Sequence, residues 1–176
     1  FNLLPWRTTA RNVEFGLELH GVSKSERTRI ARENLRKVGL GGFENYFPHQ
    51  LSGGMKQRVG IARALSVSPD LLLMDEPFGA LDPQIRELMQ IEMLKLLEAE
   101  ARTVVFVTHS VEEAIFLSDR IVIFSARPGR ILAVIDVDLP KPRWQDDEQI
   151  KISPEFVRYR SHIWHMLKSE LQRTQV

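Results

Sequence analysis

The chain has 176 residues, which is the length of roughly one domain with its own hydrophobic core. Its 24 basic and 23 acidic residues are interspersed and give a net charge of +1, so neither a nucleic-acid footprint nor an acidic tail is present. The absence of cysteine excludes disulfides and thiolate metal sites and fits a reducing compartment. No apolar run approaches the roughly 20 residues of a membrane-spanning helix, so membrane association is expected to go through a partner.

The first third of the chain is predicted to be mainly helical. Residues 8–21 leave two alternatives open, because Ala10, Val13 and Leu17 fit a helical face while alternation from Val13 to Leu19 fits a strand. The string Ser23-Lys-Ser-Glu26 is a capping box, which predicts a helix that ends at Gly39. Residues 39–50 contain glycines and Pro48 and are predicted to form a loop.

From Ser52 onward the pattern changes. Ser52 predicts a helix cap, followed by a helix through about Ser66. Strands and helices then alternate, which indicates a parallel sheet with covering helices. The predicted ranges are 71–75, 83–100, 103–108, 110–117 and 120–125.

The end of the chain is predicted to hold a hairpin and a helix. Arg127-Pro-Gly129 predicts a turn into a strand over 130–137, and residues 140–149 form a polar connection. Ser153-Pro154 then opens a terminal helix. Its apolar stripe comprises Phe156, Tyr159, Ile163, Leu167 and Leu171. We therefore divide the chain into a helical subdomain (1–66), a core (67–138) and a linker with a helix (139–176).

Three strings carry the chemistry: Leu51-Ser-Gly-Gly-Met-Lys-Gln-Arg58, Leu71-Leu-Leu-Met-Asp-Glu-Pro-Phe-Gly-Ala-Leu-Asp82 and Val107-Thr-His109. A strand that ends in Asp75-Glu76 puts one carboxylate where Mg²⁺ can be held and another where a water can be oriented. Two glycines at a helix start leave backbone N–H groups and the helix dipole available to a phosphate. These strings predict phosphate-handling machinery.

The order and spacing of these strings resemble the ATP-binding subunits of ABC transporters, with a signature motif, Walker B, D-loop and H-loop in sequence. The resemblance implies a P-loop NTPase-like (RecA-like) α/β core with a helical subdomain, and it implies ATP and Mg²⁺ as ligands. The strings Leu3-Leu-Pro-Trp-Arg7 and Ser153-Pro-Glu-Phe156 look most like the importer ATPases of the nitrate, sulfonate and taurine group.

The resemblance also implies a role for each candidate residue. Asp75 binds Mg²⁺, Glu76 is the catalytic base, and His109 contacts the γ-phosphate. The signature residues complete the ATP site of an opposing subunit, so that a head-to-tail dimer has two sites, and the D-loop aspartate couples them. The candidate nucleotide-binding residues are Ser52, Gly53, Gly54, Gln57 and Asp82.

Each role has a purely structural alternative. Asp75 could cap a helix or sit in a surface turn, and Glu76 could pair with an arginine. The Ser52 string could be a simple cap with flexible glycines. Asp82 precedes Pro83 as a helix cap, a role compatible with the other.

The phosphate-cradling pattern G-x-x-x-x-G-K-[ST] is absent, because no glycine here is followed by lysine. Phe1-Asn-Leu-Leu-Pro-Trp-Arg7 resembles the segment just after the family's glutamine-containing loop, downstream of Walker A. We interpret the chain as an amino-terminally incomplete ATPase domain, inactive alone; a natural half-domain is the alternative.

The expected function is ATP hydrolysis for an importer at the cytoplasmic face of the inner membrane. Permease subunits are direct partners, a solute-binding protein is an indirect one, and nucleic acid is not a partner. The resemblance assigns Trp6, Phe15 and the helical segment to Gly39 to the face that receives a permease helix. Two alternatives are a non-catalytic scaffold subunit and a soluble non-transport ABC ATPase.

Overall fold

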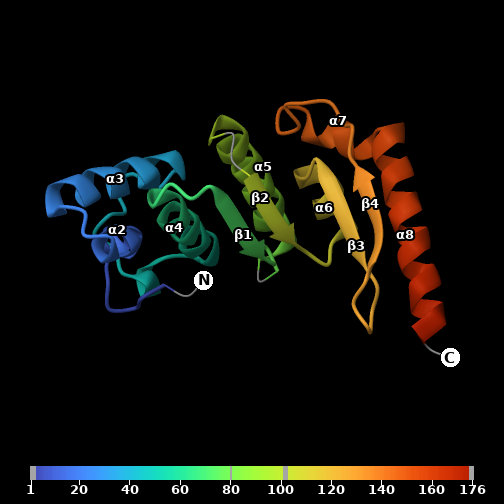
Figure 1. Ribbon diagram of the computed structural model, residues 1–176. Coiled ribbons are helices and arrows are strands. Elements are labelled where there is room, and N and C mark those ends of the chain that lie inside the picture. The colour runs from blue at the N-terminus through green and yellow to red at the C-terminus, as the bar shows by residue number, and fades with distance from the viewer. Residues whose placement is uncertain (1–2, 80, 101–102, 175–176) are drawn as a thin grey trace. The chain divides into compact units, whose positions relative to one another are not determined.

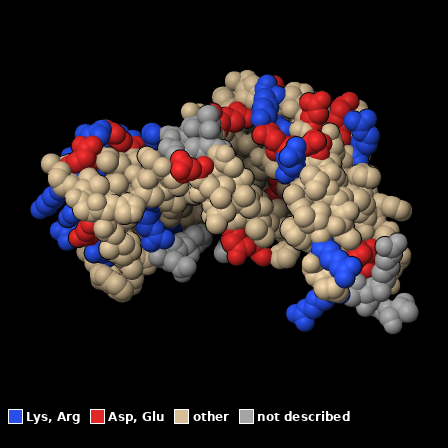
Figure 2. All heavy atoms as spheres, in the orientation of Figure 1, with Lys and Arg blue, Asp and Glu red and all other residues tan. Residues whose placement is uncertain are grey.

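The computed structural model describes residues 3–79, 81–100 and 103–174, without the side chains of residues 100, 171, 173 and 174. Phe1, Asn2 and Ala80 of the predicted strings, and the Leu171 side chain of the predicted stripe, therefore lie outside the described part. The chain forms two compact units, Phe1–Val105 and Phe106–Val176, which we describe separately (Figure 1). On the face seen in Figure 2, acidic and basic side chains are interspersed, in keeping with the net charge of +1.

The first unit begins with helices. They are α1 (Thr9–Val13), α2 (Phe15–Leu19), α3 (Lys24–Lys37), the 3₁₀ turn η1 (Pro48–Gln50) and α4 (Gly53–Ser66). Residues 9–19 are helical, so the strand alternative for this segment is wrong. The Thr8 hydroxyl caps α1 by accepting from the Arg11 N–H, and Val13 and Leu17 are buried while Leu19 is 71% exposed, which breaks the alternation that a strand requires.

The core of this unit surrounds α4. Val59 and Ala62 on α4 are fully buried, and α1, α2 and α3 all pack against this helix. Burial of a valine or leucine side chain contributes roughly 1.5–3 kcal/mol through removal from water, and burial of an alanine methyl contributes less. The other buried members of the cluster are Val13, Ala31, Leu35, Val38, Leu40 and Leu51.

A buried amide fastens the segment before α1. The Asn12 side chain is fully buried, and its Oδ1 accepts from the Leu4 N–H at 2.8 Å. Its Nδ2 lies 3.0–3.1 Å from the carbonyl oxygens of Leu4, Arg7 and Thr8. Since buried backbone groups need partners, this one side chain holds residues 4–8 in place.

A strand–helix–strand segment follows. It comprises β1 (Leu71–Asp75), α5 (Pro83–Glu100) and β2 (Thr103–Val107), with the division between the units inside β2. The two strands are hydrogen-bonded neighbours and run in the same direction (Figure 1), as the alternating sequence pattern predicts. Leu72 and Met74 are buried, which leaves Asp75 on the exposed side of β1.

The second unit contains α6 (Val111–Leu117), β3 (Arg120–Phe124), β4 (Ile131–Asp136), α7 (Asp147–Ile152) and α8 (Pro154–Thr174). The strands β3 and β4 form the predicted antiparallel hairpin, with Val122 opposite Val134. In the described residues this hairpin is a sheet of its own, separate from β1 and β2. The predicted terminal helix is confirmed as α8, whose Phe156 and Ile163 are buried.

The helix α7 corrects the prediction of a polar connection up to residue 149. Acidic residues occupy its first turn, Lys151 pairs with Asp147 one turn away, and Ile150 is buried. These signals are present in the sequence, but the helix is only six residues long.

A buried arginine ties this unit together. Arg143 is 1% exposed, and its guanidinium donates to the carbonyl oxygens of Phe116, Ser118 and Val137. Two of these carbonyls lie at the end of α6, where a helix has no partners of its own. Arg143 therefore joins the carboxyl end of α6 to the residue after β4.

The hydrogen bonds by which the Asn12 side chain holds residues 4–8, here called the Asn12 clamp, can be tested by substitution. Because Asn12→Ala removes the acceptor of the Leu4 N–H and a donor from three part-buried carbonyl oxygens, we expect it to lower the free energy of unfolding by about 1–3 kcal/mol in urea denaturation. The control is Asn45→Ala, an exposed amide in the same unit, which we expect to change stability by less than about 0.5 kcal/mol. Equal losses in the two variants would contradict the clamp.

Candidate functional site

The end of β1 presents two adjacent carboxylates on a tightly turned backbone. Asp75 is the last residue of the strand, and Glu76 leaves it with φ at +44°. Few residues other than glycine adopt this conformation, which costs about 1–3 kcal/mol and is concentrated at functional sites. Glu76 O then accepts from the Gly79 N–H at 3.1 Å, and Phe78 O accepts from the Leu81 N–H at 3.1 Å.

The buried Phe78 ring anchors these two turns, while both carboxylates stay exposed. The Glu76 side chain folds back over the turn, since a Cβ on Gly79 would lie 3.5 Å from Glu76 Oε2. The backbone of the carboxylate pair is thus held from inside the unit, and both residues are exposed at its surface.

These carboxylates fit one kind of metal site. No group of three or more histidine or acidic side chains gathers into a metal-binding cluster in the described part of the chain. Mg²⁺ commonly takes only one or two carboxylates and completes its shell with waters and substrate phosphates. Asp75 with Glu76 beside it has the oxygen donors for that arrangement and lacks those for an all-protein cage.

Asp82 caps the helix that follows the turns. Its Oδ1 accepts from the Ile85 N–H at 3.1 Å, so the predicted structural role as a helix cap is confirmed. The Arg86 guanidinium donates to Leu81 O at 2.9 Å. The loop after β1 is therefore held by hydrogen bonds within its turns and by hydrogen bonds to residues of α5.

The amino-terminus of α4 lies beside this loop. Ser52 Oγ accepts from the Met55 N–H at 3.2 Å, and Ser52 and Gly53 are exposed. A Cβ on Gly53 would lie 3.8 Å from Leu81, and one on Gly54 would lie 3.3 Å from Ile85 Cγ2. The start of α4 is thus packed against the start of α5.

Gln57 differs from its neighbours in the same string. It is only 3% exposed, and its Oε1 and Nε2 are buried without a hydrogen-bond partner among the described residues. The structure therefore brings Ser52 and Gly53 to the surface but turns the Gln57 amide inward.

His109 belongs to the second unit, whereas the other candidate residues belong to the first. It lies between β2 and α6 and is exposed. The predicted cap of the next helix is confirmed, because Ser110 Oγ accepts from the Glu113 N–H at 3.2 Å.

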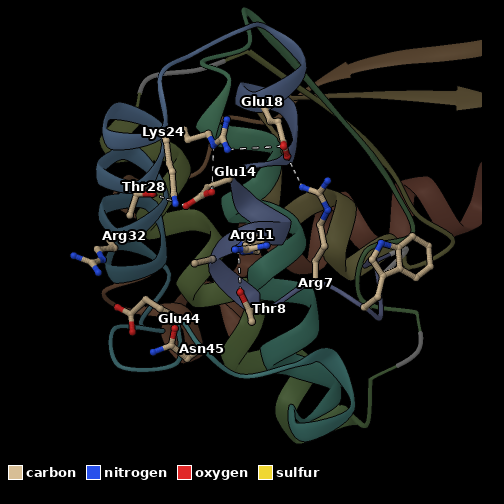
Figure 3. A pocket seen from close by; sticks show the side chains of 13 residues that line it. Arg7, Thr8, Arg11, Glu14, Glu18, Lys24, Thr28, Arg32, Glu44 and Asn45 are labelled. Carbon is tan, nitrogen blue, oxygen red and sulfur yellow. Dashed lines mark hydrogen bonds and ion pairs between the residues drawn. The ribbon is translucent and has the colours of Figure 1, made fainter.

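A charged groove of about 540 Å³ lies among α1, α2 and α3 (Figure 3). Its lining is cationic in excess, with five basic side chains and three acidic ones, and the 72%-exposed Trp6 is at its edge. The basic residues are Arg7, Arg11, Lys24, Arg27 and Arg32, and the acidic residues are Glu14, Glu18 and Glu44. Most of the groove lies within the segment up to Gly39 that the resemblance assigns to a permease helix, but its charged set was not predicted, because the members lie on separate elements and follow no local motif.

Part of the charge in the groove is compensated internally. Arg7 donates to Glu18 at 2.5 Å and holds the pKa of that carboxyl below its usual value. Arg27 lies 3.4 Å from Glu14. No ion pair within the described residues involves Arg11 or Lys24, so these two cations are available to an acidic partner.

The fold and the site define a class. A helical layer that leads into a parallel strand–helix–strand segment, with carboxylates at the strand end beside a capped helix start, is an α/β domain of the P-loop NTPase type. No helix in the described part of the chain is long and apolar enough to cross a membrane.

Comparisons with known proteins identify the family. The family model for "ABC transporter" matches residues 1–79. The chain is 51% identical to an uncharacterized ABC transporter ATP-binding protein of Methanocaldococcus jannaschii, over 99% of this chain and 63% of that protein. It is 48% identical to the taurine import ATP-binding protein TauB of Rhizobium johnstonii, over 96% of this chain and 65% of that protein.

Among solved structures, the dimeric ATP-binding cassette MJ0796 in a post-hydrolysis state with ADP and Pi matches with a TM-score of 0.64 at 36% identity. The match covers 79% of this chain and 60% of that one. The chain belongs to the ATP-binding proteins of the ABC transporter family, and it spans slightly less than two thirds of the length of these relatives.

The packing of α4 against α5 can be tested with two matched glycine substitutions. Gly53→Ala has room for its Cβ, whereas Gly54→Ala forces the Ile85 side chain to shift. Because both substitutions remove the same backbone freedom, we expect Gly54→Ala to be less stable than Gly53→Ala by about 1 kcal/mol in urea denaturation.

Ile85→Leu removes the Cγ2 methyl that Gly54→Ala meets, so the double variant should recover most of this difference. Equal stability of the two alanine variants would show that the helix starts are not packed together as described.

Proposed function

We propose that the chain is the part of an ABC importer ATPase that contains the signature, Walker B, D-loop and H-loop elements, and that the intact subunit hydrolyses ATP to drive solute uptake. The observation that carries this proposal is the exposed Asp75–Glu76 pair on its left-handed turn, in a loop whose last part, at Leu81, lies beside the amino-terminus of α4. Phosphoryl transfer needs a site that holds the metal ion and the attacking water, and it needs hydrogen-bond donors that bind the phosphates.

At the carboxylate end, Asp75 is the proposed Mg²⁺ ligand, and the metal supplies charge neutralisation at the nucleotide phosphates. Glu76 is the proposed base that accepts a proton from the attacking water. The exposed carboxylates and the turns that hold their backbone support this assignment. His109 is the proposed contact to the γ-phosphate.

At the helix end, Ser52 and Gly53 are the proposed contacts to a nucleotide held mainly by a second subunit. Their exposure, and the first-turn N–H groups of a 14-residue helix, suit an anion. Gly54 contributes by allowing the close approach of α5, and we leave the buried Gln57 out of the contacts. Asp82 stands in the sequence between Leu81 and Ile85, which lie beside this helix start, and this supports a role at the interface in a head-to-tail dimer.

The proposed transport partners are membrane permease subunits at the cytoplasmic face of the membrane. The groove among α1, α2 and α3 has the size and the spare cations, Arg11 and Lys24, to take a short helix with acidic residues. The resemblance to taurine import proteins supports a nitrate, sulfonate or taurine-like solute, which the binding protein and permease select.

The assignment of Glu76 predicts a specific variant phenotype. In the intact subunit, Glu76→Gln removes the base but keeps the shape of the side chain, so we expect the ATPase turnover to fall by about 10²–10⁴-fold. Nucleotide affinity, measured by calorimetry, should stay within about threefold of the unmodified protein.

The control is Glu92→Gln, an exposed carboxylate on α5 that lies 3.1 Å from Lys95 Nζ, and it should leave turnover unchanged. Near-normal turnover in Glu76→Gln would remove Glu76 from the role of base.

A further inference from the structure

Three hydrogen bonds close a ring around the loop that carries His109. The Ser110 N–H donates to Thr108 Oγ1 at 2.9 Å, and the Thr108 hydroxyl donates to Glu113 Oε2 at 2.6 Å. The Glu113 N–H donates back to Ser110 Oγ at 3.2 Å. All four residues lie in the second unit, so the ring is complete within one compact body.

This ring is an extended form of a capping box. In the usual box, the third helical residue reaches back directly to the N–H of the cap residue. Here Thr108 links the two, because its Oγ1 accepts a hydrogen bond from the Ser110 N–H and its hydroxyl donates one to Glu113. The enlarged ring spans both residues that flank His109, so it restrains the backbone on either side of the imidazole.

Each hydrogen bond in the ring has a defined donor and acceptor. A threonine hydroxyl has one proton, and donating that proton to a carboxylate turns its lone pairs toward the Ser110 N–H. A hydroxyl–carboxylate bond at 2.6 Å is charge-assisted and is among the stronger hydrogen bonds in proteins. Replacing either partner therefore disturbs the other bonds as well.

The ring is attached to a rigid platform. Glu113 is only 7% exposed, and Ile115 and Phe116 on the same helix are at most 1% exposed. Arg143 holds the other end of α6 through the Phe116 and Ser118 carbonyls. A fixed α6 with an exposed His109 at its start is suited to placing one side chain accurately, which functional sites require to within about 0.5 Å.

We propose that Thr108 and Glu113 are positioning residues for His109, which they hold in place by restraining residues 108–110. This inference rests on the proposed function, in which His109 contacts the γ-phosphate. Thr108 and Glu113 do not touch the nucleotide themselves. Their effect on the reaction passes through the orientation of the imidazole, and it appears in the catalytic step more than in nucleotide affinity.

The test uses four variants. Thr108→Val keeps the shape of the side chain but removes the hydroxyl, and Thr108→Ser restores the hydroxyl. Glu113→Gln keeps a neutral acceptor in case removal of the whole side chain prevents folding. The matched control is Ser118→Ala, which removes a hydroxyl-to-carbonyl bond, to Ala114, at the opposite end of the same helix.

The first measurement is amide hydrogen exchange at Ser110 by NMR, on the chain without nucleotide. We expect exchange in Thr108→Val to be about tenfold faster, because the hydrogen bond that protects this N–H is lost. Glu113→Gln should give a smaller increase, and Thr108→Ser and Ser118→Ala should stay close to the unmodified chain. Unchanged exchange in Thr108→Val would overturn the proposed ring.

The second measurement is steady-state ATP hydrolysis by the intact subunit. We expect Thr108→Val to lower kcat about tenfold with KM within about twofold, and Thr108→Ser to restore kcat. A loss of kcat in Ser118→Ala equal to that in Thr108→Val would show a general stability effect and overturn the positioning role.

The two measurements separate this inference from the function on which it rests. If His109→Ala hydrolyses ATP normally, the proposed role of His109 fails, and exchange at Ser110 alone decides whether the ring restrains the loop.

Discussion

The burial of α4 among α1, α2 and α3 is the constraint on which the first unit depends. Val59 and Ala62 are fully buried on one face of this helix, while Gly53 at its amino-terminus is exposed. Gly54 then lets α5 approach that terminus, and the turns after β1 are fixed next to it. One packed helix therefore determines where the proposed phosphate-binding surface lies and which loop is its neighbour.

The same helical layer connects two surfaces of different character. On one side α1 and α3 pack against α4, and on the other they line the cationic groove. Asn12 fastens the segment that carries Trp6 and Arg7, both at the groove, to the helix that contacts α4. A partner bound in the groove would thus contact α1 and α3, which also support the proposed nucleotide-binding surface. This arrangement is what an ATPase coupled to a permease requires.

Local signals in the sequence were sufficient to predict most of the helices and strands, and the motifs alone led to the candidate site residues, whose roles stay predictions. The caps at Ser23, Ser52 and Ser110 mark real helix starts, and β1 begins and ends at the predicted residues. Contacts between segments that are distant in the sequence could not be predicted, because no local pattern encodes them. The groove, the burial of the Gln57 amide and the hydrogen bonds of Arg143 all depend on elements that are far apart in the sequence. The strand alternative at residues 8–21 failed because tertiary burial followed the helical period, and α7 was missed because it is short.

The most direct test of the account is ATP-dependent dimerisation of the intact protein, measured by light scattering in a Glu76→Gln background that traps bound nucleotide. Ser52→Asp is the decisive second change, because aspartate also caps a helix and preserves α4 while its charge repels phosphate. The account predicts a dimer with MgATP in the Glu76→Gln protein and a monomer after Ser52→Asp is added, with equal thermal stability of both without nucleotide. Dimerisation that survives Ser52→Asp would contradict the claim that the start of α4 binds the nucleotide of a second subunit.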